Sequence, residues 1–171
     1  MTSAAYSLID VHHKDIVLRT FILFVQSAHT VLKYADAHFY RQTGLSVIKF
    51  IVLEGLAFNG GSMILSEIAE WTYRERNNIT TLISRLKKSG LVKTARKKAD
   101  KRLVSVLLTE TGREALNKAM PVAREIIDQV MSTISEDDAA LLEKRLRVLR
   151  YNAHHGLRDI VERSQPKLDQ S

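Results

Sequence analysis

Hydrophobic residues recur at three- and four-residue intervals through most of the chain, which predicts a protein built mainly from helices. The first helix is expected over about 14–41, where the apolar positions are Val17, Phe21, Phe24, Ala28, Val31 and Leu32. A second is expected over 45–58, ending at Asn59-Gly60-Gly61. The chain has only seven glycines and two prolines, so little interrupts such helices.

The spacing of hydrophobic residues changes in the middle of the chain. Residues 63–65 are long enough for one short strand, and helices are expected over 66–71 and 75–89. Gly90 suits the residue that follows a helix end. Strands are expected over 91–96 and 103–108, with Val104, Val106 and Leu108 on one face of the second and Ser105 on the other.

Two further helices are expected in the last third. One runs over 110–134, and Pro121 should bend it or remove one backbone hydrogen bond. Ser135, with Asp138 three residues later, resembles a capping box that opens a last helix through Leu149 and beyond. The whole pattern predicts a mainly α fold with a small β-hairpin wing. A winged helix-turn-helix over 45–113 is flanked by helical regions 14–41 and 114–163, in a single domain 1–171.

Composition narrows the classes of protein. A chain of 171 residues with 45% hydrophobic and 26% charged residues can bury one substantial core. It contains no cysteine, which excludes disulfides and thiolate chemistry and favours a cytoplasmic location. The longest apolar run, residues 21–25, is far shorter than the roughly 20 residues that span a bilayer, so no membrane partner is expected.

Positive charge is concentrated in one segment. Residues 74–113 contain twelve Lys or Arg and three acids, a net charge of +9, while the rest of the chain carries −2. Neutralising DNA phosphates needs such concentration. A solvated lysine-rich surface is the alternative interpretation.

The predicted helix 75–89 has two distinct faces. At 100° per residue its apolar positions, Ile79, Leu82, Ile83 and Leu86, fall on one side and should be buried. Asparagine can contact adenine and arginine can contact guanine, while threonine suits a thymine methyl or a phosphate. The helix and the turn before it therefore supply the candidate contacts to double-stranded DNA: Arg74, Arg76, Asn77, Asn78, Thr81, Ser84, Arg85 and Lys88. Arg85 could instead pair with an acid or cap the helix.

The loop between the two predicted strands is the second candidate contact. Arg102 is expected to enter the minor groove, whose narrow form attracts arginine, while Asp100 shapes the loop or orients that guanidinium. Lys97, Lys98 and Lys101 are expected to contact phosphates. The alternative for Asp100 and Arg102 is a surface ion pair of little energetic consequence.

The terminal helical regions predict a homodimer. Roughly 40 residues precede the winged segment and almost 60 follow it, and both blocks are amphipathic. Neither can bury its apolar stripe on so small a domain, so interlocking helices of two subunits are expected. Two-fold symmetry then places two recognition helices about 34–36 Å apart, which suits a palindromic operator.

Five motifs follow one another between residues 66 and 113. They are Ser66-Glu67-Ile68-Ala69-Glu70, Asn78-Ile79-Thr80-Thr81-Leu82-Ile83-Ser84-Arg85-Leu86, Ser89-Gly90-Leu91-Val92, Asp100-Lys101-Arg102 and Val106-Leu107-Leu108-Thr109-Glu110-Thr111-Gly112-Arg113. In this order they resemble the MarR family of bacterial and archaeal regulators; the resemblance covers about 45–116, and Pro121 and the segment 135–138 also fit.

The resemblance implies a homodimer, a recognition helix in the major groove and, through Arg102, a wing arginine in the minor groove. It implies a regulator, in most cases a repressor, that is often released from DNA by a small aromatic or phenolic anion. Phe50, Trp71 and Tyr73 lie near the expected effector pocket, although a core position for Trp71 is favoured. The chain departs from the family in one turn, where Thr72-Tyr73-Arg74-Glu75 replaces the usual Leu-Gly-x-Ser/Thr.

Other classes of function find less support in the sequence. No phosphate loop, nucleophile elbow or HExxH pattern indicates an enzyme, and no cofactor is expected. His12-His13 and His154-His155 invite a metal hypothesis, but adjacent histidines point to different sides of a helix; His29 and His38 are expected to be ordinary surface or interface residues. The remaining alternatives are a winged helix that binds RNA or protein without a specific operator, and a DNA-binding protein without an effector.

Overall fold

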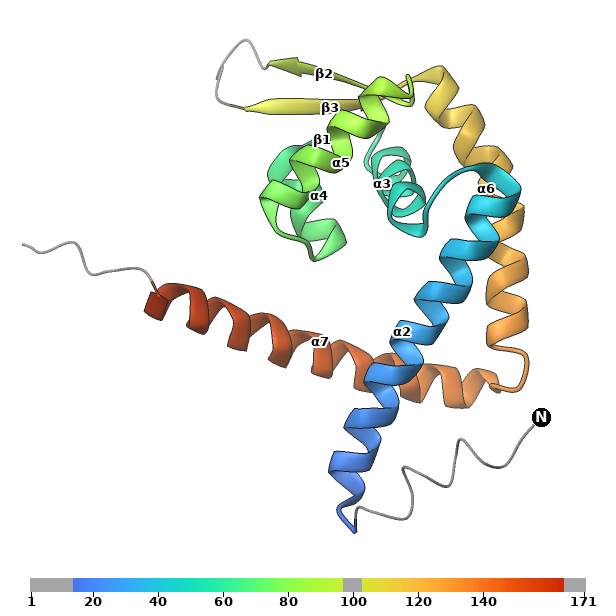
Figure 1. Cartoon of the computed structure of the whole chain (residues 1–171), viewed down its shortest axis with the longest axis vertical. Helices are drawn as coiled ribbons and strands as arrows, with labels where there is room; N and C mark the ends of the chain where they lie inside the picture. Colours follow the sequence, from blue (N-terminus) through green and yellow to red (C-terminus); the bar gives the residue numbers. More distant parts are fainter. Residues whose placement is uncertain (1–13, 97–102, 165–171) are drawn as a thin grey trace, which may run out of the picture. The chain divides into compact units, whose positions relative to one another are not determined.

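The computed structural model describes residues 14–96 and 103–164. Its contacts divide the chain into two units, Met1–Val130 and Met131–Ser171, and each is described by itself. The first unit contains α2 (Ile16–Thr43), α3 (Val47–Phe58), β1 (Ser62–Ile64), α4 (Leu65–Thr72), α5 (Arg76–Lys88), β2 (Val92–Arg96), β3 (Val104–Leu108) and α6 (Glu110–Val130) (Figure 1). The second contains α7 (Glu136–Ser164). The predicted mainly α fold with a β-hairpin wing is confirmed.

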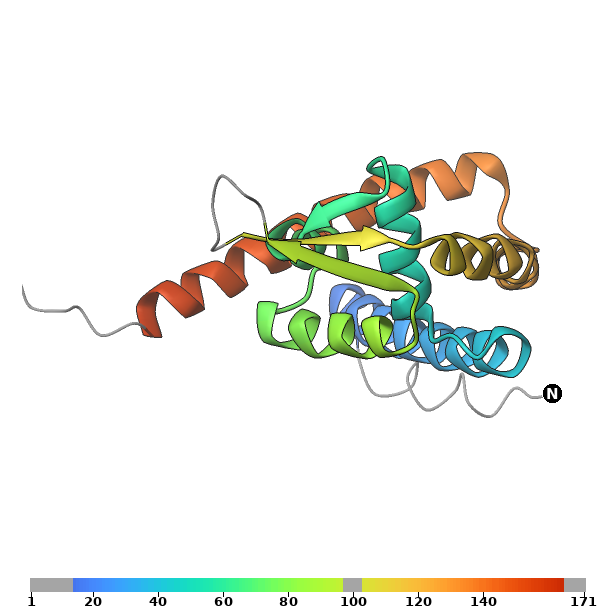
Figure 2. The same cartoon turned by 90° about the horizontal axis from the view of Figure 1, so that it is seen from above.

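The sheet has three strands in the order β1-β3-β2, all antiparallel, and Figure 2 shows β3 between its two neighbours. Val106 lies opposite Met63 on one side and Thr94 on the other. The short strand near 63–65 was predicted, but its pairing with β3 was not. Ser105 is buried in this pairing, and its hydroxyl lies 2.9 Å from that of Ser62, which satisfies it.

The core of the first unit joins α3 to the helices and strands around it. Its largest fully buried side chains come from α3, α4, α5 and β3 and are Val52, Leu53, Leu56, Ile68, Ile79, Leu86 and Val106. Burying one such aliphatic side chain contributes about 1.5–3 kcal/mol. Helix α5 is therefore anchored on the same core as the sheet.

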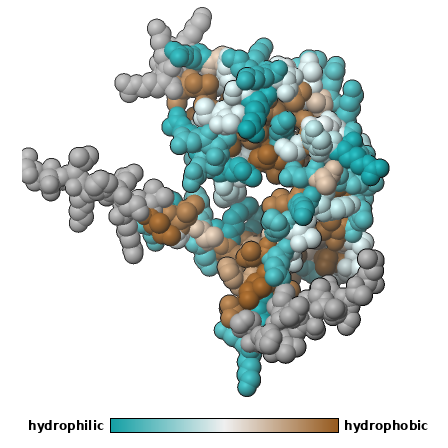
Figure 3. All heavy atoms as spheres, viewed as in Figure 1, coloured by the Kyte–Doolittle hydropathy of each residue, from teal (hydrophilic) through white to brown (hydrophobic). Residues whose placement is uncertain are grey.

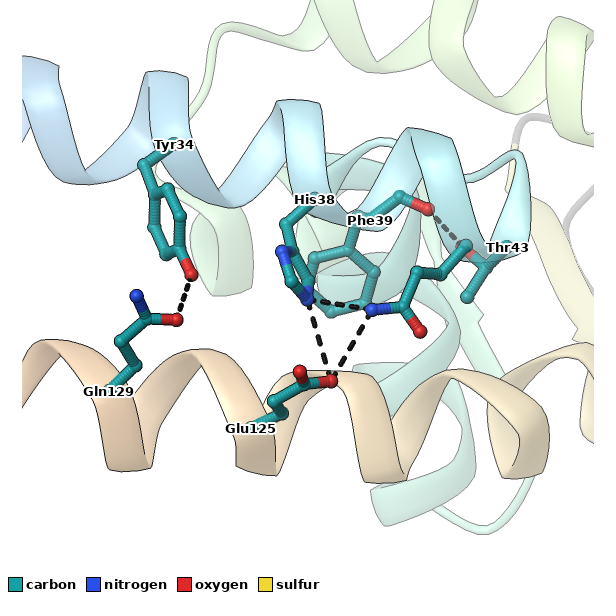
Figure 4. A network of polar contacts seen from close by, with 7 residues as sticks. Tyr34, His38, Phe39, Thr43, Glu125 and Gln129 are labelled. Atoms are coloured by element: carbon teal, nitrogen blue, oxygen red, sulfur yellow. Dashed lines mark hydrogen bonds and ion pairs between the residues drawn. The ribbon is translucent and has the colours of Figure 1, made fainter.

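Helices α2 and α6 lie side by side, and polar groups cross between them (Figures 1 and 4). The Tyr34 hydroxyl donates to the side-chain carbonyl of Gln129. The Glu125 carboxylate lies 3.5 Å from His38 Nε2 and accepts from the Gln42 amide at 3.3 Å. His38 is thus an interface residue within the chain, as the sequence indicated.

The N-terminal part of α2 packs against little of the first unit. Among residues 14–33 no side chain is buried, whereas Ala35 and Phe39 in the second half are core residues. Figure 3 shows apolar surface over this N-terminal half. Its exposed large apolar residues are Ile16, Val17, Leu18, Phe21, Leu23, Phe24, Val25, Val31 and Leu32.

By length and composition alone, α2 is also able to cross a membrane, and it is the one such helix among the described residues. The short apolar run 21–25 did not reveal this, because polar residues are spread along the helix. The buried Ala35 and Phe39 show that the second half of α2 is instead part of a folded core.

Helix ends follow the local chemistry of the sequence. The Asp15 carboxylate accepts from the Val17 and Leu18 amides and begins α2. Ser135 Oγ accepts from the Asp138 amide at 3.2 Å, which confirms the predicted start of the last helix. Helix α6 continues through Pro121 but ends at Val130, earlier than the predicted residue 134.

A close approach joins the start of α6 to the start of the wing. Gly112 is buried in the first turn of α6, and an added Cβ there would lie 2.1 Å from the Leu91 carbonyl oxygen. The neighbour is backbone and cannot rotate away. Only glycine therefore fits at this position without moving β2 or α6.

Gly112→Ala is expected to lower the free energy of unfolding by about 1–3 kcal/mol, because one methyl group must displace packed backbone. Thermal and urea unfolding of both proteins measures the change. The control is Gly156→Ala in α7, where an added Cβ meets no atom within 4 Å. Alanine there should stabilise the helix by about 0.5–1 kcal/mol. Equal stability of Gly112→Ala and the parent protein would contradict the close approach.

Candidate nucleic-acid interface

Helix α5 has one buried face and one exposed face. Ile79, Ile83 and Leu86 are buried, and Leu82 is half-buried against them, so the predicted core face is confirmed. The candidate contact residues of α5 are all exposed: Arg76, Asn77, Asn78, Thr81, Ser84, Arg85 and Lys88. Arg74, in the preceding turn, is also exposed. The fold thus places the whole candidate set on α5 and its turn in contact with solvent.

The end of α5 has the left-handed geometry that a glycine at position 90 led us to expect. Gly90 has φ +72°, its amide donates to the Lys87 carbonyl at 3.0 Å, and the Leu91 amide donates to the Leu86 carbonyl at 3.0 Å. These two bonds form a Schellman motif. Arg85, Lys87 and Lys88 occupy the last turn, where the helix dipole favours cations.

The wing consists of β2 and β3, and two cations of β2, Lys93 and Arg96, are exposed. Both belong to the basic segment 74–113, but neither was predicted as a contact. The alternation of Lys93 with the buried Val92 is a sequence signal that could have identified the exposed face of β2. Lys97, Lys98, Asp100, Lys101 and Arg102 lie outside the described residues, so their contacts stay predictions.

The cations of α5 and β2 have no acidic partner among the residues that the structure describes. Ion pairs occur elsewhere in the described part of the chain. They join His38 of α2 to Glu125 of α6, Arg124 to Asp128 within α6, and Arg147 to Glu143 within α7. The same described residues hold no cluster of three or more metal-ligating side chains. An exposed, unpaired basic surface is what a polyanion would bind.

Comparison with known proteins agrees with this geometry. Residues 38–119 match the family model described as "Transcriptional regulator SarA/Rot". The chain is 30% identical over 129 residues to the HTH-type transcriptional repressor IacR of Pseudomonas putida, covering 75% of this chain and 72% of that protein. The chain belongs to the MarR family of winged helix-turn-helix transcriptional regulators.

Solved structures of MarR-family regulators share the fold. Sco3205 of Streptomyces coelicolor, solved in complex with DNA, matches with a TM-score of 0.76 and 20% identity, covering 84% of this chain and 92% of that one. The organohalide-sensing regulator RdhR, solved with bound 2,4-dichlorophenol, matches with a TM-score of 0.73 and 21% identity over 82% of each chain. The family relationship makes this protein a DNA-binding transcriptional regulator and not an enzyme.

The turn before α5 holds the chain's departure from the MarR pattern. Tyr73 stands where the family usually has glycine, and it adopts a left-handed conformation with φ 51° and ψ 41°. It is the one non-glycine residue with positive φ in the described part of the chain. Its amide donates to the Glu70 carbonyl and the Arg74 amide to the Ala69 carbonyl, so a Schellman motif ends α4 without glycine. The backbone of the turn is retained, at a cost of about 1–2 kcal/mol for the side chain.

The second departure is at the start of α5. Glu75 precedes the helix in an extended conformation, where the family usually has serine or threonine, and its side chain makes no cap hydrogen bond. The first amides of α5 are therefore without a side-chain acceptor from this position. A hydroxyl in place of the Glu75 carboxylate would supply one.

Two of the three candidate pocket residues, Phe50 and Trp71, have different aromatic neighbours. The Phe50 ring lies 4.9 Å from that of Phe39 of α2, whereas Trp71 covers Gly55 and lies 5.6 Å from Phe58. Phe50 and Gly55 are five residues apart on α3, which places them on different faces. Trp71 is 36% exposed, so the favoured core position is not what the structure shows.

Glu75→Ser is expected to be more stable than Glu75→Ala by about 1 kcal/mol, because only serine can accept a hydrogen bond from the first amides of α5. Urea unfolding of the two variants without DNA measures the difference. Alanine is the matched control, since both variants lose the same charge. Equal stability would show that the turn does not hold residue 75 in capping geometry.

Proposed function

We propose that this regulator is a homodimeric cytoplasmic repressor that binds a palindromic duplex and is released by a small aromatic anion. In this proposal α5 occupies the major groove of each half-site and the wing, through Arg102, the adjacent minor groove. The observation that carries it is the exposed face of α5, where amide and hydroxyl side chains lie among cations that have no acidic partner in the described part of the chain. Such a face can both recognise base edges and neutralise phosphates.

The side chains of α5 support separate roles in base recognition and in phosphate binding. Asn77, Thr81, Ser84 and Lys88 follow one another at helical spacing on the side opposite Ile79 and Ile83. The Thr81 hydroxyl lies 3.4 Å from the Asn77 carbonyl, which leaves its methyl group for a thymine. Asn77 is then the candidate for adenine, while Lys88 and the wing lysines supply phosphate contacts without sequence information.

Two relatives support repression and release by a ligand. IacR is by name a transcriptional repressor, and the structure of RdhR contains 2,4-dichlorophenol. We propose Trp71 and Tyr73 as effector contacts, because both are exposed on or next to α4, immediately before α5. Phe50 would contribute from the α2–α3 side.

The dimer is supported by the exposed apolar residues of the terminal helices. The N-terminal half of α2 has nine large exposed apolar side chains, and α7, taken by itself, exposes Leu141, Leu142, Leu146, Val148, Leu149, Tyr151, Leu157 and Ile160. Exposed apolar surface of this extent marks an interaction site. A second copy of the chain is the partner that the two-fold symmetry of an operator requires.

The DNA proposal predicts a preference for native duplex that depends on α5. Fluorescence anisotropy with duplex from the protein's own upstream region and with scrambled duplex, over several salt concentrations, measures it. Asn77→Ala should reduce the preference by about tenfold or more, because a base contact is lost. Lys88→Ala should weaken binding to both duplexes similarly. It should also reduce the slope of log affinity against log salt concentration by about 1.

Arg124→Ala is the control, since this exposed arginine of α6 already pairs with Asp128 at 2.7 Å. It should leave both affinities unchanged. Equal, salt-sensitive binding of the parent protein to both duplexes would leave only electrostatic attraction. Tighter binding to single-stranded RNA would favour the interaction-module alternative.

The dimer proposal predicts a mass in solution of twice the 19.4 kDa chain. Phe21→Glu should shift the protein towards monomer, because it places a charge in the apolar surface of α2, where Phe21 is 61% exposed. Light scattering after size exclusion measures both masses. Phe58→Glu, at a 73% exposed residue of α3, is the control and should remain dimeric. A monomeric parent protein would contradict the proposal.

A further inference from the structure

The hydroxyl of Thr109 links three elements of the fold. Thr109 lies between the end of β3 and the start of α6, and its Oγ1 accepts from the Gly112 amide at 3.0 Å, which caps α6. The same hydroxyl directs its single proton between two acceptors, the Gly90 carbonyl oxygen at 2.7 Å and the Leu91 carbonyl oxygen at 2.9 Å. One half-buried side chain therefore binds the first turn of α6 and the end of α5.

Backbone contacts strengthen the same junction. The Thr109 amide donates to the Leu91 carbonyl at 3.2 Å, and the Leu91 amide donates to Leu86 within α5. Gly112 presses against the same Leu91 carbonyl, with no room for a Cβ. The residues Gly90, Leu91, Thr109 and Gly112 are called the α5–α6 junction below.

The junction lies between the part of the unit that would read DNA and the part that holds α6. Helix α6 packs on α2 and α3, while the end of α5 leads directly into β2 of the wing. The connection between the end of α5 and the start of α6 is short: it runs from the Gly90 carbonyl through the Thr109 hydroxyl to the Gly112 amide. A change at the hydroxyl must therefore alter how α5 sits relative to α6.

We propose that Thr109 is a positioning residue for DNA recognition, which fixes α5 and the wing relative to α6. This inference rests on the proposed role of α5 in reading duplex DNA. Base contacts require side chains placed to within a fraction of an ångström, whereas phosphate contacts tolerate small shifts. Loss of the hydroxyl leaves the Gly90 carbonyl without its donor and should therefore reduce sequence preference more than general affinity.

The chemistry of the side chain suggests two informative variants. Thr109→Val keeps the shape and removes the hydroxyl, so both the cap and the bond to Gly90 are lost. Thr109→Ser keeps the hydroxyl and removes only the methyl group. If the hydroxyl positions α5, serine should retain the parent behaviour and valine should not.

The chain offers a closely matched control. Thr43, at the end of α2, also donates to a carbonyl, that of Phe39 at 2.7 Å, and accepts from an amide, that of Leu45 at 3.1 Å. Its hydroxyl makes no contact with α5. Thr43→Val therefore removes the same kinds of hydrogen bond, one accepted from an amide and one donated to a carbonyl, without touching the α5–α6 junction.

The experiment combines anisotropy with hydrogen–deuterium exchange on the full-length chain, at a temperature where urea titration shows every variant folded. Thr109→Val should lose about tenfold of the preference for native over scrambled duplex, while Thr109→Ser and Thr43→Val retain it. Exchange in Thr109→Val should rise together in the last turn of α5 and the first turn of α6.

Three results are decisive against the inference or its basis. Unchanged preference in Thr109→Val, or faster exchange confined to α6, would show that Thr109 is only a helix cap. An equal loss of preference in Thr43→Val would assign the effect to general destabilisation. If the parent protein prefers no duplex, the proposed function fails, and the exchange pattern alone still decides whether the hydroxyl couples the two helices.

Discussion

The Leu91 carbonyl is the group around which the rest of the DNA-binding unit is arranged. The Leu91 amide closes the end of α5 by donating to the Leu86 carbonyl. The Leu91 carbonyl accepts from the Thr109 amide and hydroxyl, and it leaves no space for a side chain at Gly112. Three elements converge there, the end of α5, the start of β2 and the start of α6. Because α5 buries its apolar face on the same core as β3, its orientation is determined at both its face and its end.

This convergence also explains why sequence periodicity was informative for α5 and less so for its surroundings. Ile79, Ile83 and Leu86 follow the helical period because one face alone packs on the core, and Gly90 marks the helix end because its φ is positive. Both signals are local. The pairing of β1 with β3 depends on residues more than 40 positions apart, and the hydroxyl pair Ser62–Ser105 that accompanies it has no local sequence signal.

In the candidate site, too, some features have a local sequence signal and others do not. Exposure of Asn77, Thr81 and Ser84 could be predicted from the helical wheel, because it depends only on which face is apolar. The positions of Phe50 and Trp71 could not, since they depend on how α3 presents different faces to α2 and α4. At Tyr73 the sequence indicated a departure from the family, and the structure shows its form: the turn keeps the backbone expected of glycine and accepts the strain of a side chain.

The unburied N-terminal half of α2 has a consequence for how this protein reaches its folded state. Most of the stability of a helix in a protein comes from packing its apolar face, since nucleation is unfavourable and propensity alone contributes little. Residues 14–33 bury no side chain within the first unit, so packing there contributes little to the free energy that orders them. In the proposed dimer, ordering of this helix and subunit association become one bimolecular process. The measured stability of the protein would then increase with its concentration, and a regulator present at low copy number would lose helical structure and partner together.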